Sequence, residues 1–262
     1  MIVLAHRDFG GAGNPPLVLL HGLLGSSRNW QTVGRDLAVR FHVRALDLRN
    51  HGASPHAEDC GFGAMMADVL AWLDHEGIAR TTLLGHSLGG KVAMLLACHH
   101  PDRVERLVIV DIAPKDYLSR AHRAEFAAMN ELDLATLQSR GEAELRFEGR
   151  VPDWSMRKFL ATNLDRTEAG GWRWMVNLPA LTDALPLLEQ DSLAEADRFY
   201  GPTHFILGGK SRYVLPTDEE KIRRHFPLAT LTRLPDAGHN PHMESREQFV
   251  KTVLELAGSP TP

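Results

Sequence analysis

The stretch Thr82-Leu83-Leu84-Gly85-His86-Ser87-Leu88-Gly89 decides the fold of this chain. An apolar run typical of a buried strand leads directly into a G-x-S-x-G pentapeptide, and a helical pattern begins near Leu88. A serine on so sharp a strand-to-helix turn projects its hydroxyl into a cleft, and the flanking glycines leave room for the crowded backbone. The N–H groups at the start of the helix favour developing negative charge there. We predict that Ser87 is a nucleophile; the alternative is an ordinary turn serine that caps the helix.

Apolar runs like the one before Ser87 recur along the chain, with helical patterns between them. The runs cover residues 17–20, 43–48, 82–84, 107–110 and 204–207, and the helical patterns cover 65–75 and 91–98. Strands that are apolar throughout are buried on both faces, which is typical of a parallel sheet covered by helices. The sequence therefore predicts an α/β fold, a mostly parallel sheet flanked by helices, with right-handed crossovers.

The strand pattern stops after Ile112 and returns at His204. Between Lys115 and Phe199 the sequence shows mostly amphipathic helical patterns and no convincing strand; the candidate helices are 120–130, 134–140, 155–164 and 181–188. The economical interpretation is one α/β core, residues 1–114 and 200–262, interrupted by a helical cap at 115–199. Such a cap covers the carboxyl ends of the strands, where ligands bind in open α/β sheets.

A serine hydroxyl needs a general base, and the chain offers 14 histidines. His239 lies in the loop 235–241, after the last apolar run, so it fits the chain order serine, acid, histidine. Gly238 beside it allows a tight turn that aims the ring at Ser87. We predict His239 as the base, and His242 is the competing candidate. Four other histidines on helical or polar stretches are interpreted as surface residues: His99, His100, His122 and His225.

Acyl transfer also needs two N–H donors for the developing oxyanion. Leu88, the residue after the nucleophile, supplies one candidate backbone N–H. The loop after the first apolar run reads His21-Gly22-Leu23, and the N–H of Leu23 is the second candidate. We interpret His21 as a structural hydrogen-bonding residue, and the polar turn 49–54 as a hydrogen-bonded support of the oxyanion loop.

Composition excludes several classes of function. The formal net charge is -4, with 29 basic and 33 acidic residues, so nothing favours nucleic-acid binding. Cys60 and Cys98 are the two cysteines, and without a Cys-x-x-Cys we expect neither a disulfide framework nor a structural zinc site. The first residues lack the basic region of a signal peptide, and no apolar run is long enough to span a bilayer. We expect a cytoplasmic monomer or homodimer without metal, cofactor or stable membrane insertion.

Several motifs occur in the order of a known family. They are His21-Gly22, Asp47-Leu48-Arg49-Asn50-His51-Gly52-Ala53-Ser54-Pro55, Gly85 to Lys91, Asp111-Ile112-Ala113-Pro114 and Gly238-His239. With them the chain resembles the α/β-hydrolase superfamily, and more narrowly the YbfF-type esterases and thioesterases. The resemblance spans residues 21–239 and implies an esterase or thioesterase with a small helical lid and no cofactor.

The acid of the triad departs from the wider family. Many relatives carry it as Gly-x-x-Asp in the loop that here begins at Gly208, but Arg212 stands at that position and a guanidinium has no acceptor. The resemblance to the narrower family implies Asp111, which directly follows the run 107–110 and should emerge at the catalytic edge. The competing carboxylates are Asp116, Asp218 and Asp236.

The leading hypothesis is hydrolysis of small-molecule carboxylic esters or thioesters through a covalent acyl-serine. Alternatives are carbon–carbon bond hydrolysis or perhydrolysis on the same triad, or a non-catalytic ligand receptor on this fold. Cap side chains are candidates for an acyl pocket, although packing of the cap onto the core explains any single one equally well. They are Phe126, Met129, Phe159, Leu160, Trp172, Trp174 and Met175.

Overall fold

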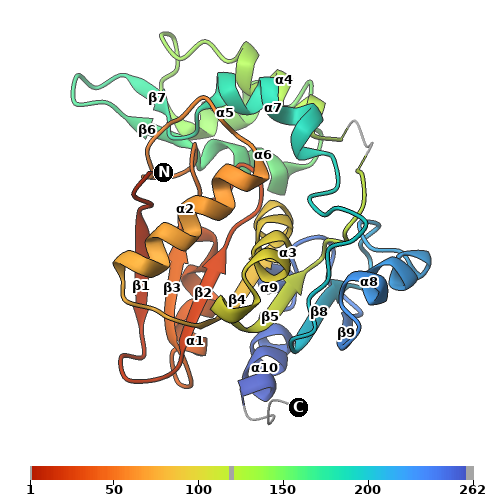
Figure 1. Ribbon diagram of the computed structural model, residues 1–262. Coiled ribbons are helices and arrows are strands. Elements are labelled where there is room, and N and C mark those ends of the chain that lie inside the picture. The colour runs from red at the N-terminus through yellow and green to blue at the C-terminus, as the bar shows by residue number, and fades with distance from the viewer. Residues whose placement is uncertain (1, 118–120, 258–262) are drawn as a thin grey trace.

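The computed structural model describes residues 2–117 and 121–257. Within them, seven strands form one sheet in the order β1-β3-β2-β4-β5-β8-β9 (Figure 1). These strands are β1 (His6–Gly10), β2 (Pro16–Leu20), β3 (His42–Leu46), β4 (Thr81–His86), β5 (Val104–Val110), β8 (Thr203–Gly208) and β9 (Ala229–Leu234). Every neighbouring pair is parallel except β1 with β3, so the predicted fold class is confirmed. The edge strand β1 escapes prediction because its residues form no apolar run.

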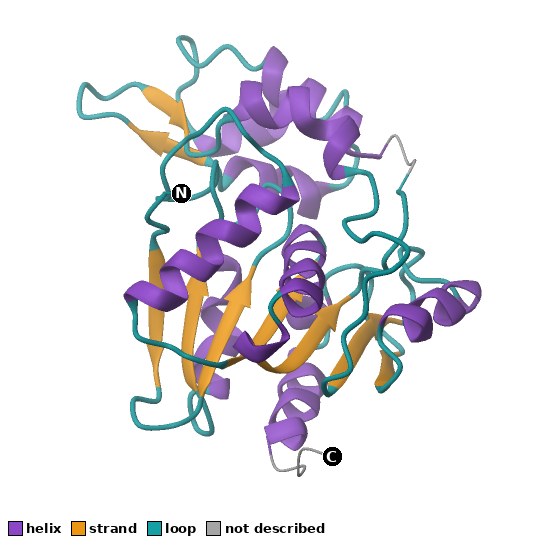
Figure 2. Ribbon diagram, in the orientation of Figure 1, coloured by secondary structure: helices purple, strands orange, loops and turns teal. Residues whose placement is uncertain are grey.

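Helices cover both faces of the sheet (Figure 2). Side chains of α2 (Phe62–His75) and α3 (Leu88–His99) share one apolar cluster with Val18 and Leu20 of β2. Side chains of α1 (Gln31–Leu37) and α10 (Arg246–Ala257) share the opposite cluster with Leu17 and Leu19. Because successive residues of a strand point to opposite faces, a strand covered on both sides must be apolar throughout, as β2 is. Shorter helices complete the core: α8 (Glu219–His225), α9 (Pro241–Glu244), and the 3₁₀ helices Ser27–Trp30, Pro101–Arg103 and Pro216–Asp218.

The segment between β5 and β8 lies over one end of the sheet, at the top of Figure 1. We call it the insert. It contains α4 (Ala121–Glu131), α5 (Arg140–Arg146), α6 (Trp154–Ala161) and α7 (Leu178–Leu188). Two of its asparagines fasten it to loops that follow β2 and β3: Asn163 Nδ2 donates to Leu24 O (2.9 Å), and Asn177 N donates to Asn50 O (3.0 Å). The insert therefore sits at the carboxyl ends of the strands.

Two expectations for the insert are wrong. It contains a hairpin, β6 (Leu164–Arg166) with β7 (Trp172–Trp174), whose three-residue strands are too short to show alternation in the sequence. Residues 134–140 do not form a helix, because Ser139 accepts a hydrogen bond from Glu142 N and thereby starts α5 at Arg140. Among the helices of the described ranges, none is both long and apolar enough to cross a membrane.

Candidate active site

Ser87 occupies the sharp turn between β4 and α3 that the sequence predicts. Its backbone is strained, with φ 49° and ψ -115°, and its N–H donates to Val110 O (3.2 Å). The turn depends on glycine on both sides of the serine. A Cβ atom on Gly85 would lie 2.2 Å from Gly89 O, and one on Gly89 would lie 2.5 Å from Leu20 O. The crowded backbone holds the side chain of Ser87 at the wall of a cleft, where 8% of the residue is exposed.

Asp111 and His239 are joined by a hydrogen bond of 2.8 Å between Oδ2 and Nδ1. Asp111 directly follows β5 and is fully buried, with φ 49°. Its carboxylate accepts two further hydrogen bonds from the loop after β8: Gly208 N donates to Oδ1 (2.9 Å), and Ser211 Oγ donates to Oδ2. The loop in which many relatives carry the acid thus supplies donors to Asp111, while Arg212 contributes no acceptor.

The three competing carboxylates lie in other contacts. Asp116 Oδ1 accepts from Asp191 N (2.8 Å), and Asp218 pairs with Lys115 and accepts from Leu215 N. Asp236 is largely exposed and lies 3.3 Å from Lys210 Nζ. Among the residues that the structure describes, Asp111 alone forms a carboxylate hydrogen bond with His239.

Besides Asp111, two residues contact His239: one stacks on its ring and the other binds its backbone carbonyl. Tyr213 stacks on it with ring centroids 3.5 Å apart and an interplanar angle of 14°. His86 Nε2 donates to His239 O (2.8 Å). With Nδ1 donating to Asp111, the proton-accepting nitrogen is Nε2, and His239 lines the same cleft as Ser87.

The competing His242 packs behind the site. Its ring lies between Trp30 and His86, at centroid distances of 4.5 and 4.8 Å, and 2% of the residue is exposed. Burial, reinforced by the nearby His239, lowers the pKa of His242 to about 3. Its Nδ1 has no hydrogen-bond partner within the described part of the chain, so no carboxylate orients it as Asp111 orients His239.

The candidate oxyanion loop passes directly beside Ser87. A Cβ atom on Gly22 would lie 3.3 Å from Ser87 Cβ, so only glycine permits this approach. Leu23 lines the space around Ser87 together with Leu88, the other predicted donor. The backbone of Leu24, the next residue, is held by two hydrogen bonds. Leu24 N donates to His51 Nε2 (3.2 Å), and Leu24 O accepts from Asn163 of the insert. Leu23 and Leu88, the residues predicted to supply the two N–H donors, therefore border the same space as Ser87.

Two buried histidines support this loop as hydrogen-bonding residues, which agrees with the sequence-based interpretation. His21 Nε2 accepts from Leu48 N (3.0 Å), and its Nδ1 donates to Gly22 O (2.8 Å). His51 accepts from the loop through Nε2 and donates through Nδ1 to Arg49 O (2.8 Å). Burial lowers the pKa of His21 and, for His51, lowers it to about 3, so both rings are neutral and can donate and accept at once.

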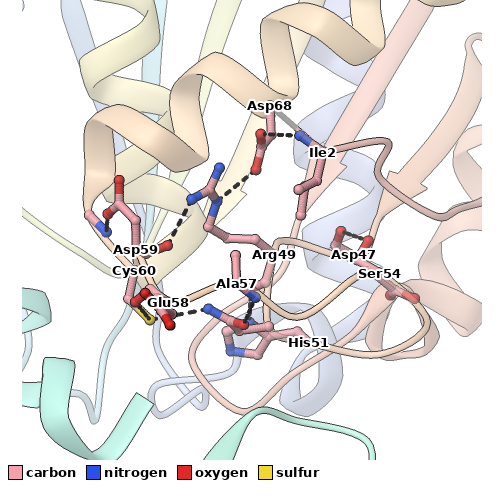
Figure 3. Close-up of polar contacts among 12 residues, drawn as sticks. Ile2, Asp47, Arg49, His51, Ser54, Ala57, Glu58, Asp59, Cys60 and Asp68 are labelled. Carbon is pink, nitrogen blue, oxygen red and sulfur yellow. Dashed lines mark hydrogen bonds and ion pairs between the residues drawn. The ribbon is translucent and has the colours of Figure 1, made fainter. Parts of the chain in front are cut away.

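The polar turn that contains His51 is anchored to α2 by a buried ion pair (Figure 3). Arg49 Nε lies 2.7 Å from Asp68 Oδ2, and Asp68 Oδ1 accepts from Ile2 N (3.0 Å). Asn50 Oδ1 accepts from Ala57 N, and Asn50 Nδ2 lies 3.1 Å from Cys60 Sγ. The network fixes the turn beneath the oxyanion loop. Cys60, which is buried, and Cys98 are both free thiols.

A cleft of about 530 Å³ opens above Ser87; we call it the large cleft. Of the seven insert side chains proposed for an acyl pocket, only Phe159 lines it, joined by its neighbour Met156. Phe126, Met129 and Leu160 are buried in the apolar core, Trp172 and Trp174 pack in the hairpin, and Met175 lines a separate pocket. The sequence shows which residues are apolar but not which of them face the cleft.

Among the residues of this cleft that sequence reasoning did not place there are His122, Glu125 and Tyr213. His122 is not the surface residue it was expected to be, because α4 begins over the site and burial lowers its pKa to about 4. The spacing of His122 and Glu125, three residues apart, places both on one helix face and was the available signal. His225 is also buried, at 2% exposure, with Nδ1 bonded to Asp197 O (2.8 Å).

The fold and this site together define a hydrolase of the α/β class. The chain belongs to the α/β-hydrolase family: a family model described as alpha/beta hydrolase fold matches residues 15–245. It is 39% identical over 255 residues to the sn-1-specific diacylglycerol lipase ABHD11 of Mus musculus, which covers 94% of this chain and 82% of that protein. It is 34% identical to esterase YbfF of Escherichia coli, over 92% of each chain.

A solved structure named marine microorganism esterase shares the whole fold, with a TM-score of 0.94 at 32% identity over 97% of this chain and 99% of that one. The predicted family is therefore confirmed, and the chain is an enzyme of the ester-hydrolase class. Among residues 2–117 and 121–257, no group of three or more His, Cys, Asp or Glu side chains is arranged to hold a metal ion.

Proposed function

We propose that this enzyme hydrolyses small-molecule carboxylic esters, thioesters included, through a covalent acyl-serine. Ser87 is the nucleophile, His239 the general base and Asp111 the orienting acid, and the N–H groups of Leu23 and Leu88 receive the oxyanion. The observation that carries the proposal is the 2.8 Å bond from His239 Nδ1 to Asp111, on a ring that lines the same cleft as Ser87.

The proposed reaction has two halves. In the first, Ser87 Oγ attacks the ester carbonyl while His239 Nε2 takes its proton, and the imidazolium then gives that proton to the departing alcohol or thiol. In the second, His239 takes a proton from water, the resulting hydroxide displaces the acyl group, and the proton returns to Ser87. Asp111 keeps Nδ1–H oriented and stabilises the imidazolium in both halves. The sum is ester plus water giving acid plus alcohol.

Names of the relatives support ester chemistry. The mouse relative is named for cleavage of diacylglycerol at sn-1, and the Escherichia coli relative is named an esterase. A relative from Cyberlindnera fabianii, 28% identical over 96% of this chain, is named ethanol acetyltransferase 1. An ester hydrolase and an acyltransferase share the first half-reaction and differ in whether water or an alcohol accepts the acyl group.

We further propose that the insert, residues 115–199, is a cap on a core of residues 1–114 and 200–262. The support is its contribution to the walls around Ser87: His122 and Glu125 come from α4, and Met156 and Phe159 from α6. We also propose that the protein is located in the cytoplasm.

The test is the rate of p-nitrophenyl ester hydrolysis by Ser87→Ala, compared with Ser155→Ala, a serine that lines the same cleft. We expect kcat/KM of Ser87→Ala to fall by about 10⁴-fold or more, and that of Ser155→Ala to stay within a few fold of wild type. Circular dichroism checks that both variants are folded. A folded Ser87→Ala with near-normal turnover contradicts the proposal.

A further inference from the structure

Two cavities of very different size meet at Ser87. One is the large cleft of about 530 Å³; the other, which we call the small cavity, has about 30 Å³ of space for water-sized groups. The residues that line both are Leu23, Ser87, His122 and Tyr213. An ester bound at Ser87 has two arms, the acyl chain and the alcohol, so the two cavities offer one place for each.

The position of His239 indicates which cavity binds the alcohol and which binds the acyl chain. Its ring lines the large cleft and does not line the small cavity. In the proposed mechanism, His239 must protonate the leaving alcohol and later deprotonate the attacking water, so both must approach from the side of its Nε2. The alcohol therefore occupies the large cleft. The acyl chain leaves the carbonyl carbon in another direction, and the small cavity is a second space that Ser87 borders and His239 does not.

The walls of the small cavity suit a hydrocarbon chain. Leu88, Ile112, Leu185 and Leu188 supply apolar surface. Two polar side chains at its edge are engaged elsewhere: Lys91 Nζ donates to Leu188 O (2.9 Å) and Gln190 O, and the hydroxyl of Tyr117 accepts from Ala113 N and donates to Tyr213 O. Glu189 Oε2 is paired with Arg123 (3.2 Å), whereas Glu189 Oε1 is buried without a hydrogen-bond partner in the described part of the chain.

The cavity is also short. Its space of about 30 Å³ is far smaller than the roughly 530 Å³ of the large cleft, so the small cavity accommodates a much shorter chain than the large cleft does. Its far wall is fixed, because Lys91 ties the end of α7 to α3 only one turn beyond the nucleophile. We propose that this cavity is the acyl pocket, and that the enzyme selects esters of short acids with alcohols of much larger size. The proposal rests on the proposed function.

The sharpest test uses two isomeric esters, hexyl acetate and ethyl hexanoate, which have the same atoms and similar hydrophobicity but exchange the long and short arms. We expect wild type to hydrolyse hexyl acetate with a kcat/KM about tenfold or more above that for ethyl hexanoate. Leu188→Ala lengthens the small cavity and should narrow this ratio by about tenfold. Leu181→Ala, an equally buried leucine of α7 that lines neither cavity, is the matched control and should leave the ratio unchanged.

Phe159→Ala tests whether the alcohol binds in the large cleft and the acyl chain in the small cavity, since Phe159 lines only the large cleft. It should change the dependence on alcohol length and leave the dependence on acyl length as in wild type. Equal hydrolysis of the two isomers by wild type, or a loss of acyl selectivity in Phe159→Ala and not in Leu188→Ala, overturns the inference. Neither result touches the proposed function, which fails only if a folded Ser87→Ala still hydrolyses both esters.

Discussion

Asp111 Oδ2 lies 2.8 Å from His239 Nδ1, although the two residues are 128 positions apart in the chain. The contact forms because β5 and β8 are parallel neighbours and the chain turns back toward their carboxyl ends after β9. In the proposed mechanism, this contact orients the imidazole of His239.

Asp111→Asn should therefore lose activity heavily, by about 10⁴-fold in kcat, because an amide cannot hold the same tautomer or stabilise the imidazolium. Steady-state kinetics with a p-nitrophenyl ester measures the loss. Asp116→Asn and Asp236→Asn are matched controls, since both carboxylates are bonded elsewhere, and both should retain near-normal kcat. Near-normal kcat in Asp111→Asn with a loss in either control would move the acid to that residue.

Gly22→Ala should impair the same reaction by crowding the nucleophile. The added methyl would lie 3.3 Å from Ser87 Cβ and 2.9 Å from His86 Nδ1, so the oxyanion loop must move. Loss of one oxyanion donor costs about 10²–10³-fold in kcat, and we expect an effect of that order. Gly149→Ala is the control, because a Cβ atom there meets nothing within 4 Å. Normal kcat in Gly22→Ala would exclude this loop from the oxyanion site.

Asp68→Ala should destabilise the fold by about 3–5 kcal/mol, because it leaves the guanidinium of Arg49 buried without its carboxylate. Chemical denaturation measures the change in the free energy of unfolding. Asp74→Ala on the same helix is the control, since Asp74 is mostly exposed where it pairs with Arg103, and it should cost less than about 1 kcal/mol. Equal costs for the two variants would show that the ion pair does not anchor the turn at 49–54.

Lys91 should make stability depend on pH in the alkaline range. Burial lowers the pKa of Lys91 from 10.5 to about 8, so between those values the unfolded chain binds more protons than the folded one. The contribution of Lys91 to the free energy of unfolding is lowest below about pH 8, where the amine is protonated in both the folded and the unfolded chain. This contribution rises as the pH increases toward 10.5. The free energy of unfolding of wild type minus that of Lys91→Met should thus increase from pH 7 to pH 10, by up to about 3 kcal/mol.

The exposed Lys251 is the control for this titration, and Lys251→Met should show the pH dependence of wild type. A wild-type minus Lys91→Met difference that stays constant, or falls, from pH 7 to pH 10 would contradict the burial of a charged amine beside the nucleophile helix.

Local patterns explain what the sequence predicts well. The strand, the turn and the helix around Ser87 are contiguous, and the two glycines that permit the turn are visible as residues. The position of Asp111 directly after β5 is predictable because it follows an apolar run, whereas its choice over the other carboxylates depends on the resemblance to the narrower family. By contrast, Tyr213 stacks on His239 only because the loop after β8 comes back over the site, a tertiary contact with no periodic signature.

In the insert, the sequence predicts the mainly helical structure but not which side chains face the cleft. Trp172 belongs to a strand of three residues and stacks beneath Arg166, 3.9 Å from guanidinium carbon to ring centroid, so its aromatic character does not mark the cleft. His122 looks polar and exposed in the sequence, yet it lines both cavities at Ser87. Which helix face meets the core is decided by packing, and one sequence does not reveal it.

The covalent role of Ser87 is tested most directly by mapping the adduct of a fluorophosphonate probe. Cleavage after Arg80 and Lys91 releases the peptide 81–91, which contains a single serine. If Ser87 is the nucleophile, wild type loses ester hydrolysis in step with labelling, mass spectrometry finds the probe on Ser87, and Ser87→Ala is not labelled. A probe found on another peptide, or full ester hydrolysis in an enzyme that the probe has labelled elsewhere, would contradict this role.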